Sequence, residues 1–227
     1  MATQASKDSG SGMFAPIEAI VMPILKKIPL KQAQVWAAAY FRPMATYELH
    51  KKEAEISRVA VHFALAGAML WLAAFIASLL SLNPLGALIL LPGVIIYPIV
   101  LVISGFISSI AYFILAKILG GKGGFMQQTL AMALILGGYA VLAFPFSALS
   151  GIPIVGGILA LAALLIGLYN LYNGYLVIKG VHQLSTLKAA AVVLIPLVIL
   201  AVLAFVFAAI VAVSLIGAGL LSGGLGN

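Results

Sequence analysis

Cysteine is absent from this chain of 227 residues, and charged residues make up only 7% of it. Without cysteine the protein forms no disulfides, iron–sulfur clusters or cysteine-bound zinc sites. An average soluble domain is about a quarter charged. A chain that is 64% hydrophobic cannot cover a water-facing surface with so few polar groups, so we expect lipid to be the solvent for most of it.

Acidic residues and arginine are missing from the whole of residues 59–227. All five acidic residues and eight of the twelve basic ones lie in residues 1–58, although the chain as a whole carries a net charge of +7. This gradient is typical of a membrane-proximal cytoplasmic head. A nucleic-acid-binding surface would also interleave aromatic residues with the basic ones, so we expect no nucleic-acid partner.

Five apolar runs follow residue 58. A helix needs about 20 apolar residues to cross roughly 30 Å of hydrocarbon, and residues 85–116 are too long for one upright helix and too short for two. Pro92 and Pro98 divide this run into a short extracytoplasmic segment, residues 84–93, and a span. The sequence therefore predicts an all-α, polytopic bundle of five transmembrane helices, at about residues 59–82, 94–116, 129–149, 152–178 and 189–217.

The four lysines after residue 58 test that number of spans. Lys117 and Lys122 flank the connection between the second and third spans, and Lys179 and Lys188 flank the connection between the fourth and fifth. Five spans put every basic residue on one side of the membrane, whereas four or six put lysines on both sides. By the positive-inside rule we expect that side to be cytoplasmic, with the N-terminus inside and residues 218–227 as a short outside tail.

The first 58 residues are predicted to form a tail and a head. Residues 1–12 are small and polar, which predicts a disordered tail. Residues 13–58 are predicted to form a cytoplasmic or interfacial helical head. The prediction rests on apolar residues that recur at three- and four-residue spacing from Phe14 to Ile28. Two placements stay open for this amphipathic helix. It lies in the membrane plane with its lysines toward the headgroups, or it packs on the inner surface of the bundle.

Small and polar residues within the spans indicate where helices meet. Small-x-x-x-small spacing, which lets helix backbones approach closely, occurs in the second span at Ser104/Ser108 and Gly105/Ser109. Asn170 and Asn173 are three residues apart and share a face of the fourth span. We expect them to make interhelical polar contacts, with the lining of a shallow cavity as the alternative.

Motifs for catalysis or cofactor binding are weak. Ser185-x-x-Lys188 matches a string of acyl-transfer enzymes, but its companion motifs are absent. The run at residues 120–124 lacks the spacing of a phosphate-binding loop. His50-x-x-Glu53 has no third ligand nearby for a metal, and no span contains a carboxylate of the kind that ion-coupled transporters use. We therefore expect no enzyme activity, no cofactor and no metal site.

Three segments resemble the Yip family of five-span membrane proteins. They are the connection after the second span, the connection before the fifth, and the start of the bundle: Ala116-Lys117-Ile118-Leu119-Gly120-Gly121-Lys122-Gly123-Gly124-Phe125, Lys179-x-x-His182-x-Leu184-Ser185-Thr186-x-Lys188-Ala189 and Phe41-x-Pro43. The resemblance covers roughly residues 40–215, and the short loops are similar to those of prokaryotic members. Eukaryotic members bind Rab-type GTPases in vesicle traffic, but no segment here matches a partner-binding motif, so the resemblance implies a fold and no named partner.

The sequence favours a non-enzymatic scaffold of the cell membrane that organises lipids or partners from its cytoplasmic side. Its expected partners are membrane lipids, other membrane proteins or a second copy of the chain. One alternative is a small transporter, channel or lipid-handling protein, and another is an accessory subunit of a larger membrane complex. The candidate residues for contact with a partner or a headgroup are Lys117, Lys122, Lys179, His182 and Lys188.

Overall fold

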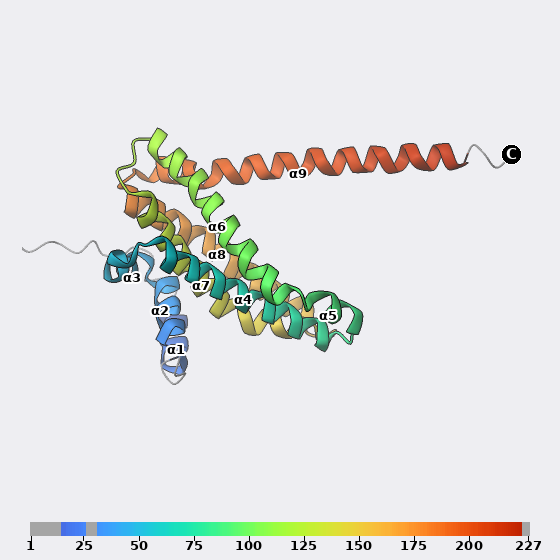
Figure 1. Ribbon diagram of the computed structural model, residues 1–227, viewed down its shortest axis with the longest axis horizontal. Helices are drawn as coiled ribbons and strands as arrows, with labels where there is room; N and C mark the ends of the chain where they lie inside the picture. The colour runs from blue at the N-terminus through green and yellow to red at the C-terminus, as the bar shows by residue number, and fades with distance from the viewer. Residues whose placement is uncertain (1–14, 26–30, 224–227) are drawn as a thin grey trace, which may run out of the picture.

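The computed structural model describes residues 15–25 and 31–223, and they are helical almost throughout (Figure 1). The elements are α1 (Ala15–Leu25), α2 (Lys31–Phe41), α3 (Pro43–His50), a 3₁₀ turn η1 (Lys51–Glu53), α4 (Ile56–Leu80), α5 (Pro84–Leu90), α6 (Gly93–Ile118), α7 (Phe125–Leu149), α8 (Gly156–His182) and α9 (Thr186–Gly223). No strand occurs in these residues, so the predicted all-α class is confirmed. The predicted tail at residues 1–12 lies outside the described residues.

Five of the described helices are long and apolar enough to cross a membrane, which confirms the predicted number of spans. They are α4, α6, α7, α8 and residues 186–211 of α9. Helix α7 begins at Phe125 rather than at 129, and α8 ends at His182 rather than at 178. The reason is that hydropathy falls where glutamine and lysine begin, while the backbone hydrogen bonds of the helix continue through these residues.

Helix α7 is the axis of the bundle. It packs against α4 on one side, α8 on another and α2 on a third. More than half of its most apolar stretch is buried inside the protein, whereas α6 and α9 expose most of theirs. Much of its buried surface is alanine and glycine. No hydrophobic force drives helices together in lipid, so these small residues stabilise the bundle by allowing close van der Waals contact between backbones.

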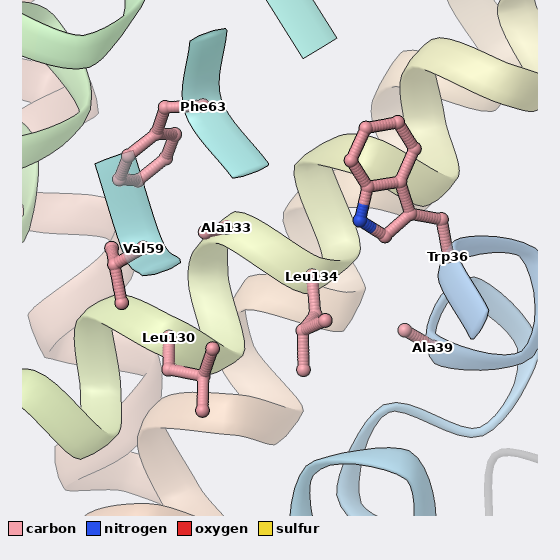
Figure 2. Close-up of a cluster of buried hydrophobic side chains, with 7 residues drawn as sticks. All are labelled: Trp36, Ala39, Val59, Phe63, Leu130, Ala133 and Leu134. Atoms are coloured by element: carbon pink, nitrogen blue, oxygen red, sulfur yellow. The ribbon is translucent and has the colours of Figure 1, made fainter. Parts of the chain in front are cut away.

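Helix α2 packs on the bundle beside α4 and α7. Figure 2 shows Trp36 of α2 beside Leu134 of α7, in the buried cluster that Phe63 of α4 completes. The approach of α2 to α7 is close because α7 carries two consecutive glycines. A Cβ atom on Gly137 would lie 2.4 Å from the Trp36 ring, and one on Gly138 would lie 2.4 Å from the Trp36 carbonyl oxygen.

Polar groups fasten α2 to the spans. The indole N–H of Trp36 donates to Nδ1 of His62 in α4, over 2.9 Å. The Tyr40 hydroxyl donates to the Ile166 carbonyl of α8. Helix α1, which contains most of the predicted amphipathic helix, packs in turn on α2, and the Glu18 carboxylate pairs with the Arg42 guanidinium just beyond α2 at 2.8 Å. Helix α2 therefore packs on the bundle and α1 packs on α2, while the place of α1 relative to the membrane plane stays a prediction.

Helix α9 packs on the bundle at its start and then leaves it (Figure 1). Its first turns join a buried cluster with α6 and α8 through Ala189, Val192 and Val193. From Val198 on, the helix exposes its apolar side chains on all sides as far as they are described. Its 38 residues span about 57 Å, longer than the roughly 30 Å hydrocarbon layer, and the helix continues into residues 218–223 of the predicted outside tail.

We expect Gly138→Ala to destabilise the protein, because the new Cβ would meet the Trp36 backbone, which cannot rotate away as a side chain would. Overpacking of this kind costs about 1–3 kcal/mol. The midpoint of thermal unfolding in detergent, followed by circular dichroism, should fall. Gly157→Ala in α8 is the matched control, because a Cβ there meets nothing within 4 Å. Equal midpoints for the two variants would show that the α2–α7 contact is not tight.

Candidate functional site

The four lysines of the membrane domain lie in or beside two connections that meet at one end of the bundle. The connection between α6 and α7 (residues 119–124) contacts the end of α8, where the Lys122 amide donates to the His182 carbonyl at 3.0 Å. The connection between α8 and α9 (residues 183–185) follows His182 directly. We call these two connections the loop pair. The helix α3 packs on the same end, where Tyr47 joins a buried cluster with Val177 and Val181 of α8.

Glycine is needed in the loop pair because the backbones run so close together. A Cβ on Gly123 would lie 2.5 Å from the Val181 carbonyl oxygen, and one on Gly121 would lie 2.8 Å from the Ala116 carbonyl oxygen. Gly120 adopts a φ of +88°, a conformation that other residues rarely take. The glycine-rich run at residues 120–124 therefore lets this connection pack closely against the end of α8.

His182 is fully buried beneath the loop pair. Its Nε2 lies 2.7 Å from Oε1 of Gln128, and Nε2 of Gln128 donates to the Ser109 carbonyl at 2.9 Å. An amide oxygen only accepts, so the proton of the neutral imidazole is on Nε2. This chain of hydrogen bonds joins α8, α7 and α6. In this structure His182 reaches no solvent, and its contact with a partner or headgroup stays a prediction.

The lysines differ in how firmly they are held. Three have a partner in the protein: the Lys117 ammonium lies 5.4 Å from the Phe113 ring centre, Lys179 donates to Thr186 at 3.1 Å, and Lys188 donates to the Leu119 carbonyl at 2.9 Å. Lys122 is exposed and makes no side-chain hydrogen bond or ion pair within the described residues. Its ammonium group is the one most available to an external anion.

The acidic groups of the head do not neutralise these lysines. Each described carboxylate pairs with a basic residue near it in the head: Glu18 with Arg42, Glu48 with Lys51, Glu53 with His50 and Arg58, and Glu55 with Arg58. The hydrogen bond from His50 lowers the pKa of Glu53, so this carboxyl group stays ionised and paired. Among the described residues, the charge of the loop lysines is therefore uncompensated.

The two asparagines of α8 have different surroundings. Asn173 is fully buried and donates from its side-chain amide to the Tyr40 carbonyl of α2, over 2.8 Å. Asn170 is half-buried and lines a cavity of about 260 Å³ between α6, α7 and α8. The side-chain oxygen of neither asparagine has a hydrogen-bond partner among the described residues. No group of three His, Asp or Glu residues that could hold a metal occurs in the described part of the chain.

Sequence reasoning missed Gln128 and Trp36. Gln128 is fully buried and holds His182, although it stands at the polar edge of an apolar run. A buried amide can be suspected there because polar side chains in a span are costly without a partner. Trp36 and Tyr40 are four residues apart in an alanine-rich segment. That spacing puts both on one face of a helix, which could have indicated the surface that packs on the bundle.

We expect His182→Ala to destabilise the loop pair, because it leaves the buried Gln128 oxygen without a donor. An unsatisfied buried acceptor costs about 1–3 kcal/mol. Thermal unfolding midpoints of His182→Ala, Gln128→Ala and the double variant form a cycle, in which the second change should cost less than the first. Lys122→Ala, at an exposed side chain without a partner, is the control. Fully additive effects would mean that the two side chains do not act on each other.

Comparison with known proteins assigns the chain to a family. The sequence model of the Yip1 domain matches residues 37–210, from within α2 into α9. No curated protein and no solved structure matches the chain. The matched region includes the loop pair and the other segments on which the resemblance rested, so that resemblance is confirmed. The chain belongs to the Yip1 domain family and is a multi-pass integral membrane protein.

Proposed function

We propose that this protein is a non-enzymatic, membrane-organising scaffold that binds anionic lipid headgroups through the loop pair. The observation that carries the proposal is the group of four lysines at the loop pair, with no described acidic residue paired to any of them. Each basic residue held near an anionic membrane surface contributes about 1 kcal/mol of attraction. Bound headgroups would gather anionic lipid around the protein.

The rigidity of the loop pair supports this role. The backbone bond from Lys122 to His182 and the buried link from His182 to Gln128 fix the loops before any ligand arrives. A site that is already ordered loses less conformational entropy on binding. The lysine that no protein group holds, Lys122, projects from this fixed backbone.

The proposal places the loop pair in the cytoplasm and the protein in the cell membrane. The distribution of basic residues supports this orientation, because the four lysines of residues 59–227 are confined to the loop pair and the helix ends beside it, and Arg58 stands in the first turn of α4. The positive-inside rule makes such an end cytoplasmic. An acidic surface of a partner membrane protein would meet the same charges, so partner binding is the other outcome of the test below.

The cavity beside Asn170 favours a second candidate function, lipid handling within the bundle. Residues 59–227 contain no carboxylate, whereas ion-coupled transporters usually rely on ionisable residues within the membrane. Ion-coupled transport is therefore less well supported than lipid handling. The exposed length of α9 offers a surface for an accessory role in a larger complex, which purification in mild detergent and identification of co-migrating chains would detect.

We expect Lys122→Gln to weaken the binding of phosphatidylglycerol about fivefold, the equivalent of the roughly 1 kcal/mol that one basic residue contributes. Native mass spectrometry of the purified protein, titrated with phosphatidylglycerol, measures the change. Lys31→Gln removes the same charge from an exposed site at the start of α2 and should leave binding unchanged. Equal binding by wild type and Lys122→Gln would reject the loop pair as the lipid site. If Lys122→Gln binds phosphatidylglycerol as wild type does but loses a protein that co-purifies with wild type, the loop pair is a surface for a partner protein.

A further inference from the structure

The cavity beside Asn170 exists because α6 packs along α4 and only lightly against α8. Gly105 allows this packing, since a Cβ there would lie 2.7 Å from the Phe63 ring of α4. The space left between α6 and α8 has a volume of about 260 Å³, and α7 forms its floor. Its polar lining comes from Ser104, Ser108, Ser109 and Tyr112 of α6 and Asn170 of α8.

The cavity opens to the side of the bundle. Two of its lining residues, Ser104 and Ser108, are exposed, and so is Leu171 of α8. Ser104 lies near the middle of α6, which runs from Gly93 to Ile118. The medium at that height of a spanning helix is hydrocarbon. A ligand would therefore enter from the bilayer.

Unpaired oxygen atoms in the wall indicate what kind of ligand fits. Ser109 is 1% exposed and its hydroxyl has no hydrogen-bond partner, and the side-chain oxygen of Asn170 has none either. A buried polar group without a partner costs about 1–3 kcal/mol, and no water is present in hydrocarbon to satisfy it. A serine hydroxyl can turn to another staggered rotamer and reach a new partner. The wall therefore offers one acceptor and one group that both donates and accepts.

The charge of the lining excludes an ionic ligand. None of the residues that line the cavity is acidic or basic. A phosphate or ammonium group would lose its hydration without gaining an opposite charge, which is strongly unfavourable. An uncharged hydroxyl can both donate to the Asn170 oxygen and accept from the Ser109 hydroxyl.

We propose that this cavity binds a neutral lipid with a free hydroxyl, of the diacylglycerol class. The hydroxyl hydrogen-bonds with Asn170 and Ser109, and the acyl chain follows the apolar wall toward the bilayer. A volume of about 260 Å³ is just below the roughly 300–1,000 Å³ of sites that enclose whole ligands. The cavity therefore holds the head and the first part of one chain. This site lies within the bundle and is separate from the lysines of the proposed scaffold function.

The test uses the full chain in detergent-free nanodiscs that contain a diacylglycerol with a photoreactive diazirine in one acyl chain. After illumination, mass spectrometry identifies the labelled peptides. We expect labelling to concentrate on residues 101–112 and 170–174. Unlabelled dioleoylglycerol should compete for it, whereas dioleoyl phosphatidic acid, with the same chains and a charged head, should not. Competition by both lipids alike would overturn the assignment of a neutral ligand.

Two glycines of α8 give a matched pair of variants. A Cβ on Gly174, which lines the cavity, or on Gly157, which does not, meets no atom within 4 Å. We expect Gly174→Leu to fill the cavity and reduce the competed labelling at least fivefold, while Gly157→Leu leaves it unchanged. Labelling that is the same in both variants would overturn the proposal.

A third variant tests the hydroxyl itself and does not depend on filling the cavity. Asn170→Leu keeps a similar volume and removes the acceptor. In wild type, dioleoylglycerol should compete at least fivefold better than its O-methyl ether, and in Asn170→Leu the two should compete equally. If Gly174→Leu fails to fold, this comparison decides. A wild type that does not distinguish the alcohol from the ether would overturn the proposed hydrogen bonds.

Discussion

The structure depends on the cost of placing charge in hydrocarbon, which is several kcal/mol for a lysine at the centre of a span. Residues 59–227 meet this constraint by carrying only four charged residues, all of them next to the loop pair. That arrangement requires an odd number of spans, and it gathers the ends of α6 and α8 with the starts of α7 and α9. The same constraint that orders the bundle therefore produces its one strongly charged surface.

Water is absent from the interior of such a bundle, so buried polar groups must find partners within the protein. Trp36 donates to His62, Asn173 to the Tyr40 carbonyl, and His182 to Gln128. Each bond joins helices that are far apart in the sequence. Four buried side-chain atoms of the described residues depart from this pattern: the Ser109 hydroxyl, the side-chain oxygens of Asn170 and Asn173, and Nδ1 of His182. Two of them, on Ser109 and Asn170, line the same cavity. Departures from otherwise consistent packing are where function is most expected.

The spans could be predicted from the sequence, and most of the tertiary contacts could not. Hydropathy alone separates five apolar runs, and the four lysines exclude an even number. The helix against which α2 packs was not predictable, because this contact depends on Gly137 and Gly138 about a hundred residues later. The burial of His182 likewise depends on a residue distant in the sequence, and His182 was expected at an exposed surface. Its partner, Gln128, is 54 residues away and belongs to another span.

The central claim, that the loop pair faces the cytoplasm, can be tested directly because the chain has no cysteine. Single cysteines introduced as Lys122→Cys in the loop pair and Ile154→Cys in the connection between α7 and α8 would each be the only thiol. Ile154 is 92% exposed. In intact cells, a membrane-impermeant maleimide should label Ile154→Cys at once and Lys122→Cys only after permeabilisation. The reverse pattern would contradict the account.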